Sequence, residues 1–322
     1  MTLPTVALAI PMYNESESLP YLFERLDRLF ASERRVEFSV VCVDDGSTDN
    51  TATVLRRLQG NRENVTVIEL ARNYGKEIAM AAAFDNVDGD ACVVIDADLQ
   101  DPPELIPEMV TVWLETGADD VYAQRTARRG EKAWKRITSH LFYRLLSSVS
   151  RVPIQVDTGD FRLLSKRAVL ALRQHRESQR YTKGLYSLIG LRKAPIKYER
   201  DPRIAGQTKW RIGSLVNLAV EGVTSFTTVP LRIATLIGLT VSALAFLYIV
   251  IIVGRTLLHG VDVPGYASLM SVVLLLGGVQ LLAIGLIGEY VGRIFLETKA
   301  RPLYLLKDPP LEGSRDKAPS SA

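Results

Sequence analysis

The stretch ACVVIDADLQDPPE, residues 91–104, decides how the N-terminal part of the chain is expected to fold. An apolar run leads into Asp96 and Asp98, and Pro102 and Pro103 then turn the chain. A short apolar run bounded by turn residues is typical of a strand buried on both faces. The two acids, one residue apart in an extended segment, should point to opposite sides. Carboxylates at the end of a buried strand need a partner or water, which favours a functional role.

A second stretch, FSVVCVDDGSTDNT at residues 38–51, repeats this pattern. Its apolar run ends at Asp44 and Asp45, and a helix capped by Thr48 or Asp49 is expected to follow. Two adjacent acids exceed what a helix cap needs. The chain contains neither G-x-G-x-x-G nor G-x-x-x-x-G-K-[ST], so the dinucleotide and P-loop interpretations lack their fingerprint.

The first 125 residues alternate between strand-like and helix-like segments. Apolar strands between helices predict an α/β fold with a mostly parallel sheet covered on both faces. Ligands of such sheets bind outside the carboxyl ends of the strands, which is where the acids fall. The expected strands are residues 6–11, 38–44, 65–70, 91–96 and 120–123, and the expected helices are residues 17–30, 48–58 and 75–84.

Composition excludes several classes of protein. With 47% hydrophobic and 23% charged residues, the 322-residue chain is not wholly disordered. A net charge of +3 is too even for a dedicated nucleic-acid binder, so no nucleic-acid partner is expected. Two cysteines, Cys42 and Cys92, exclude a disulfide scaffold, and their apolar surroundings predict buried thiols. Since the three histidines lie far apart, carboxylates would have to hold any metal, which points to Mg²⁺ or Mn²⁺.

Two uncharged segments, residues 233–253 and 267–287, predict a transmembrane hairpin. Each has 21 residues, which at the helical rise is about 31 Å, the thickness of a bilayer core. The first fifteen residues lack the features of a secretory signal, so the N-terminal part is expected in the cytosol. The basic flank of the second segment predicts that both termini are cytosolic; it consists of Arg293, Lys299, Arg301 and Lys307.

Two further segments have the pattern of amphipathic helices. Residues 133–150 could pack on the core or lie in the membrane interface, and the sequence leaves both open. Residues 212–228 lead directly into the first apolar segment, which favours the interface. The residues from Asp308 onward are rich in Pro and Ser and are expected to be disordered. The predicted domains are a catalytic domain (1–210), a juxtamembrane helix (211–230), the hairpin (231–300) and a cytosolic tail (301–322).

Four motifs in one order carry a resemblance to a known family. They are IPMYNE at 10–15, DDGSTDNT at 44–51, RNYGK at 72–76 and DADLQDPPE at 96–104. This order resembles family 2 glycosyltransferases of the GT-A fold, over essentially residues 5–300. With the C-terminal hairpin, the chain is similar to the polyprenyl-phosphate hexosyltransferase branch, which holds dolichyl-phosphate mannose synthases and bactoprenol glucosyltransferases. The resemblance implies a nucleotide-sugar donor, a lipid-phosphate acceptor and a bilayer.

The resemblance also implies roles for individual residues. Asp96 would lie near the ribose of the nucleotide. Asp98, with Gln100 as a candidate second ligand, would bind Mg²⁺ or Mn²⁺ on the diphosphate. Lys76 would bear on the nucleotide, and a solvated lysine at a helix start is the alternative. The residues expected around the base are Pro11, Tyr13 and Glu15, with Asp45 on its polar edge.

Asp160 lies in TGDFRL, residues 158–163, which resembles the segment that places the third acid of the family. In relatives with alcohol acceptors this acid acts as a base. A phosphate monoester has its second pKa at about 6 and is already largely dianionic at pH 7, so it needs no strong base. We therefore expect Asp160 to orient the acceptor or a metal-bound group. A turn cap is the alternative.

Two anionic substrates require cations. Arg125, Arg128 and Arg129 follow the strand 120–123 and are placed to receive the lipid phosphate. Arg203 and Lys209 lie in DPRIAGQTKW, residues 201–210. This segment resembles the mobile R-x-x-G-x-[ST]-K segment of the family near the diphosphate. A solvated basic rim is the alternative.

The expected activity is inverting, non-processive transfer of a hexose from a UDP-sugar to undecaprenyl phosphate. The resemblance favours glucose, and 4-amino-arabinose and mannose stay open. The expected place is the cytosolic face of the inner membrane, and paired spans are compatible with a homo-oligomer. A processive polysaccharide synthase would carry Q-x-x-R-W, whereas QTKW at 207–210 has the wrong spacing. A non-catalytic scaffold or a flippase component is the third alternative, and the intact acids argue against it.

Overall fold

The computed structural model describes residues 2–125, 158–178, 180–198, 229–259 and 265–308. The chain forms two compact units. One unit holds the β-sheet and residues 302–308, and the other holds the two long helices near the C-terminus. Each unit is described by itself below.

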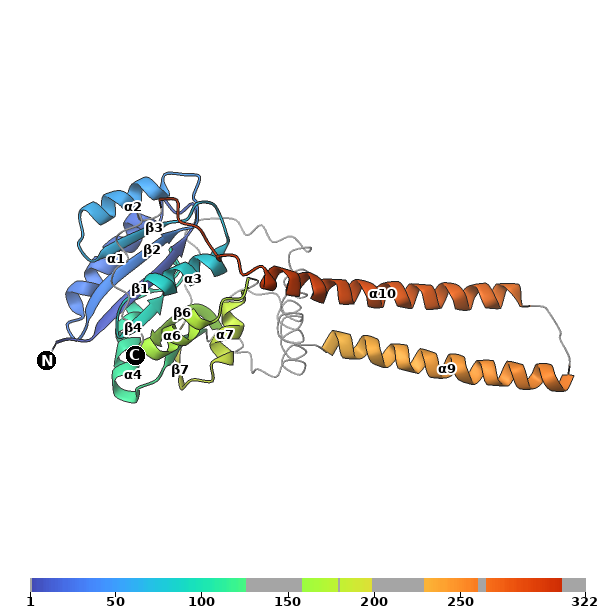
Figure 1. Cartoon of the computed structure of the whole chain (residues 1–322). Helices are drawn as coiled ribbons and strands as arrows, with labels where there is room; N and C mark the ends of the chain where they lie inside the picture. The colour runs from blue at the N-terminus through green and yellow to red at the C-terminus, as the bar shows by residue number, and fades with distance from the viewer. Residues whose placement is uncertain (1, 126–157, 179, 199–228, 260–264, 309–322) are drawn as a thin grey trace, which may run out of the picture. The chain divides into compact units, whose positions relative to one another are not determined.

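A seven-stranded sheet forms the centre of the first unit, in the order β3-β2-β1-β4-β6-β5-β7 (Figure 1). Among the described strands β6 alone runs against the other six, because it pairs antiparallel with both β4 and β5. The predicted α/β fold with a mostly parallel sheet is therefore confirmed. The strands are β1 (Thr5–Met12), β2 (Glu37–Asp44), β3 (Val65–Glu69), β4 (Ala91–Val94), β5 (Asp120–Arg125), β6 (Thr158–Ser165) and β7 (Lys193–Tyr198).

Helices cover both faces of the sheet, as the continuous apolar strands predict. On β1, Leu8 belongs to the core on one face and Ala9 to the core on the other, since side chains alternate along a strand. One core packs against α1 (Leu19–Ser32), α2 (Thr51–Gly60), the short helix η1 (Pro103–Leu105) and α4 (Ile106–Thr116). The other packs against α3 (Lys76–Asn86), α6 (Lys166–Gln174) and α7 (Thr182–Leu188).

The two cysteines are buried on opposite faces of the sheet. Cys42 lies in the core under α1 and Cys92 in the core under α3. Burial raises the pKa of both thiols to about 12, so neither is a thiolate at neutral pH. The prediction of buried thiols is confirmed.

Helix α2 begins at Thr51, three residues later than the predicted start at Thr48. The expected cap, Asp49, accepts hydrogen bonds from Thr51 N, the first residue of the helix, at 3.0 Å and from the Ser16 hydroxyl at 2.6 Å. Thr48 N donates to the side chain of Asn14 at 2.8 Å. The predicted cap residues therefore tie down the loop after β1, and the helix starts only beyond them.

The second unit consists of α9 (Val229–His259) and α10 (Tyr266–Thr298), which contact each other. Both helices are longer than the predicted apolar segments. In the described part of the chain, one stretch, Leu275–Thr298, is long and apolar enough to cross a membrane, with a mean hydropathy of 1.5. Ala234–Tyr248 is a shorter apolar stretch, so the first span of the predicted hairpin, residues 233–253, stays a prediction. The predicted amphipathic helices 133–150 and 212–228 lie outside the described residues.

The predicted C-terminal tail begins with an ordered segment. Leu306 forms an antiparallel bridge with Leu70, immediately after β3 (Figure 1). Tyr304 and Leu306 also pack against the core under α3. Residues 302–307 are thus part of the sheet unit, and residues 309–322 lie outside the described residues.

Candidate active site

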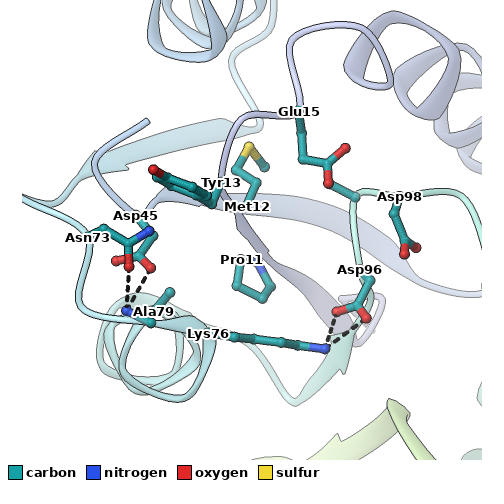
Figure 2. A pocket seen from close by; sticks show the side chains of 12 residues that line it. Pro11, Met12, Tyr13, Glu15, Asp45, Asn73, Lys76, Ala79, Asp96 and Asp98 are labelled. Carbon is teal, nitrogen blue, oxygen red and sulfur yellow. Dashed lines mark hydrogen bonds and ion pairs between the residues drawn. The ribbon is translucent and has the colours of Figure 1, made fainter. Parts of the chain in front are cut away.

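A cavity of about 340 Å³ opens where β1, β2 and β4 end (Figure 2). Parallel strands present their carboxyl ends at one edge of a sheet, which brings the acids of two motifs together. Apolar, aromatic and charged residues line the cavity together. Eight of them are Pro11, Met12, Tyr13, Glu15, Asp45, Lys76, Asp96 and Asp98. The predicted nucleotide-binding residues that lie in the described part of the chain therefore all line one cavity.

The two acids after β4 line the same cavity, so the prediction that they point to opposite sides is wrong: residues two positions apart in an extended segment share a face. Strand β4 ends at Val94, and a turn begins between Asp96 and Asp98. The turn continues through Leu99, whose φ of 59° lies in the left-handed region. Asp98 accepts hydrogen bonds from the backbone N and side-chain Nε2 of Gln100, at 3.1 and 2.5 Å.

The two acids after β2 are held differently. The Asp44 carboxylate accepts from Ser47 N at 3.1 Å, and the Ser47 hydroxyl donates to the same oxygen. Asp45 accepts from the backbone N–H groups of Tyr74 and Gly75, at 2.7 and 2.8 Å. Both acids are buried. The turn after β2 is thereby fastened to the loop between β3 and α3.

Gly46 is required at this junction for two reasons. Its φ of +66° favours glycine, and a Cβ atom there would lie 2.4 Å from the backbone carbon of Arg72. The β2 turn and the β3–α3 loop therefore approach each other more closely than a side chain allows.

Lys76 bridges the carboxylate of Asp96, which follows β4, and that of Asp160 on β6. Its Nζ lies 2.7 Å from Oδ1 of Asp96 and 2.8 Å from Oδ2 of Asp160. Figure 2 shows the lysine side chain extended below Pro11 toward Asp96. The Lys76 side chain keeps 44% of its exposure, so it remains accessible from the cavity. Lys76 is thus an exposed residue at the start of α3 that pairs with two carboxylates, and its role at the nucleotide stays a prediction.

This bridge sets the charge of the site. Burial acts to raise the pKa of Asp160, but the charges of Lys76 and Lys183 outweigh it and the pKa is lowered. Burial raises the pKa of Asp96, and Lys76 only partly opposes this. The two carboxylates outweigh burial at Lys76 and raise its pKa. At neutral pH the lysine is therefore charged and Asp160 is ionised.

The loop after β1 supplies the remaining wall of the cavity. Tyr13 is 42% exposed, so its ring can stack on a planar ligand. Glu15 N donates to the hydroxyl of Thr51 at 2.9 Å, which fixes the loop against α2. Burial, together with the charges of nearby acids including Asp98, raises the pKa of Glu15 although Ser18 donates to its carboxylate. Burial likewise raises the pKa of Asp45 against the two N–H donors.

Comparisons of the sequence with known proteins indicate the family to which the chain belongs. A model of glycosyl transferase family 2 matches residues 7–172, more than half of the chain, and a model of the GtrB C-terminal hairpin matches residues 229–294. An uncharacterized glycosyltransferase of Synechocystis is 44% identical over 94% of this chain and 95% of the relative. Bactoprenol glucosyl transferase of Shigella phage SfX is 41% identical over 94% of this chain and 98% of the relative.

The chain belongs to glycosyl transferase family 2. It is therefore a glycosyltransferase with a GT-A-like sheet, and the cavity at the strand ends is its candidate active site. Among solved structures, glucosyl-3-phosphoglycerate synthase from Mycobacterium tuberculosis, in complex with Mn²⁺, UDP-glucose and phosphoglyceric acid, is 19% identical over 67% of this chain and 76% of that chain, with a TM-score of 0.45.

Several cations predicted for this glycosyltransferase are not placed by the structure. Arg125 is the last residue of β5 and pairs with Tyr198 of β7, but its side chain is not described. The other four, Arg128, Arg129, Arg203 and Lys209, lie outside the described residues. Their roles remain predictions.

Sequence analysis missed the support beneath Asp160. Arg162, only 1% exposed, donates to Asp120 at 2.9 Å, and its guanidinium lies 3.6 Å from the centre of the Tyr186 ring. This buried stack holds the β6 backbone next to Asp160. A charged residue two positions after Asp160 was the available signal, because alternation on a strand places both side chains on one face.

Proposed function

We propose that this glycosyltransferase transfers glucose, with inversion, from UDP-glucose to the phosphate of a membrane polyprenol such as undecaprenyl phosphate. The observation that carries the proposal is the cavity that joins Tyr13, Asp45, Asp96 and Asp98 in a chain whose full-length relatives include bactoprenol glucosyl transferases. The name of such a relative supports both the sugar and the lipid class of acceptor.

The donor nucleotide fits the half of the cavity formed by β1 and β2. The exposed ring of Tyr13 would stack on uracil, with Pro11 beneath it. Glu15 and Asp45 offer carboxylate oxygens to the N–H edge of the base, and Asp96 stands toward the ribose. A cavity of about 340 Å³ is within the usual range for small-molecule sites.

A divalent cation fits the other half, beside Asp98. Within the described ranges, no three His, Cys, Asp or Glu side chains gather closely enough to hold a metal. Mg²⁺ commonly binds one or two carboxylates and takes further oxygens from substrate phosphates, which matches a single cavity-facing Asp98. Gln100 turns its amide nitrogen toward Asp98, so it orients that carboxylate. When bound, the metal would neutralise the charge on the departing nucleotide diphosphate.

Asp160 and Lys76 would position the reacting groups. Oδ1 of Asp160 is buried and accepts no hydrogen bond from the described residues, so it can accept one from a sugar hydroxyl. An ionised Asp160 would repel a phosphate dianion, but the Lys76 ammonium between Asp160 and Asp96 offsets that repulsion. The acceptor is already a nucleophile, so orientation and charge stabilisation carry the catalysis.

The acceptor phosphate would meet the cations beyond β5 and β7. We assign Arg125, Arg128 and Arg129 to the lipid phosphate, because two anionic substrates in one site need compensating charge. Arg203 and Lys209 would close over the diphosphate. These assignments rest on sequence alone.

We further propose that α9 and α10 both cross the inner membrane, with the catalytic unit and both termini in the cytosol. Large apolar side chains are exposed on both helices, for example Phe246 at 70% and Leu281 at 71%, which water does not favour. The chain enters α9 after β7 and returns after α10 to the sheet unit. A chain that leaves and rejoins one unit crosses a bilayer an even number of times, which supports two spans. Paired spans would also allow a homo-oligomer.

A donor panel tests this function. Purified full-length protein is given undecaprenyl phosphate and, separately, UDP-glucose, UDP-4-amino-4-deoxy-arabinose or GDP-mannose, with Mg²⁺, Mn²⁺ or chelator. We expect a glucosylated lipid phosphate, identified by mass, only with UDP-glucose and a metal. Transfer from another donor would reassign the sugar, and a polymeric product or no transfer from any donor would contradict the proposal.

A further inference from the structure

Residues 302–307, which we name the C-terminal strap, extend the sheet beyond β3. Ala71 N donates to Leu305 O at 2.8 Å, and Lys307 N donates to Glu69 O at 2.9 Å. Strand β3 is the last strand of the sheet, so these bonds satisfy backbone groups on its outer edge. The strap therefore behaves as a short antiparallel strand supplied from the far end of the sequence.

Side chains fix the strap to α3 and its neighbours. Leu306 and Tyr304 pack against the core that includes Ala79 and Ala83. The Tyr304 hydroxyl donates to Oδ2 of Asp85 at 3.0 Å. Burial and the Asp85 charge raise the pKa of Tyr304 to about 12, so this donor keeps its proton at neutral pH. Together these contacts define one position of the strap on the sheet unit.

The loop that follows β3 lies between the strap and the active site. Ala71 is held by the strap, and Tyr74 and Gly75, three and four residues later, donate to Asp45. Asn73 and Lys76 line the cavity (Figure 2). Gly75 lines it as well. One end of the loop is thus fixed by the β2 turn; the other end follows the bond from Leu70 N to Asp44 O, at 2.9 Å, and is also bonded to the strap.

We propose that the strap is a positioning element for donor binding, which holds the loop from Ala71 to Gly75 in the conformation that binds the nucleotide diphosphate. This inference rests on the donor site proposed above. The three residues Lys299–Arg301 separate α10 from the strap, so the strap also links the end of a proposed membrane helix to the donor site. Donor affinity would then depend on how the C-terminal end of α10 is held.

Leu306→Asp in the full-length chain tests the strap. The change places a charge against the core under α3 and should detach the strap from β3. We expect the Kd of UDP with Mn²⁺, measured by calorimetry, and the KM of the donor to rise about tenfold, as loss of two backbone hydrogen bonds implies, while kcat at saturating donor stays within twofold. Leu114→Asp is the matched control, because Leu114 is 44% exposed on α4, away from the strap.

Amide hydrogen exchange provides a readout that needs no ligand. The Ala71 amide should exchange faster in Leu306→Asp than in the wild type, while amides of β1 are unchanged. If Leu306→Asp does not fold, Tyr304→Phe provides a milder change with an expected two- to threefold rise in Kd. If a folded strap variant shows the wild-type Kd for UDP and the wild-type exchange rate at the Ala71 amide, the inference about the strap is wrong. The proposed donor site would not be affected by that result. If the wild type itself binds no UDP, the donor site is wrong and the inference falls with it.

Discussion

The turns after β2 and β4 carry similar acids but hold them by different means. After β2, Asp45 accepts hydrogen bonds from two backbone N–H groups, and Gly46 packs against the backbone of Arg72. After β4, Asp96 is bonded to the flexible side chain of Lys76, and Asp98 is bonded to both the backbone N and the flexible side chain of Gln100. Side-chain partners can move when a ligand arrives, whereas a backbone partner cannot move without unfolding its loop. We infer that the acids of the β2 turn stabilise the structure of the site, and that the acids of the β4 turn interact with the substrates.

The same substitution at each turn would separate these roles, and Asp98→Asn should have the largest effect. Removing the charge from the cavity-facing carboxylate should lower kcat by about a thousandfold, as loss of a group that stabilises the leaving charge does. The free energy of unfolding should change by less than about 1 kcal/mol, because an amide oxygen can still accept from Gln100 N. Transfer assays and urea unfolding of the full chain measure both. Undiminished transfer would remove Asp98 from the reaction.

Asp45→Asn should show the reverse pattern. An amide has one oxygen, so its NH₂ group would face one of the two N–H donors of Tyr74 and Gly75. A buried donor left without its acceptor costs about 1–3 kcal/mol, which should appear as lower stability and a higher donor KM. At saturating donor, kcat should fall far less than in Asp98→Asn. Equal loss of kcat in the two variants would end the distinction between the turns.

The sequence predicts the strands that lead into these two turns better than it predicts the conformation of the turns themselves. The apolar runs before Asp44 and Asp96 are sufficient to predict two buried strands and the edge at which their acids meet. One point of backbone geometry was not predictable: Leu99 takes a left-handed conformation without a glycine to mark it. The shared side of Asp96 and Asp98 was predictable, because residues two positions apart in an extended segment share a face.

The long-range partners were also hidden in the sequence. Lys76 reaches Asp160 only because β6 inserts antiparallel beside β4, and the strap pairs with β3 from the other end of the chain. Local periodicity contains no information about such pairing. The short apolar and aromatic sequence PLYLL at 302–306 was the available signal for the strap, and a composition-based interpretation assigned it to the tail.

Asp49→Asn tests the outer part of the β2 turn, where we expect the smallest effect on stability. Burial acts to raise the pKa of Asp49, but hydrogen bonds from Ser16 and Thr51 outweigh it and lower the pKa from 3.8 to about 2. A lowered pKa in the folded state stabilises the fold above pH 3.8, and the contribution is lost as the pH falls toward 2. Because Asp49 is exposed, the effect should be below about 1 kcal/mol. Urea unfolding of the wild type and Asp49→Asn should therefore differ slightly at pH 6 and converge as the pH drops below 4. A difference that grows on acidification would mean that Asp49 does not hold the loop after β1 through its charge.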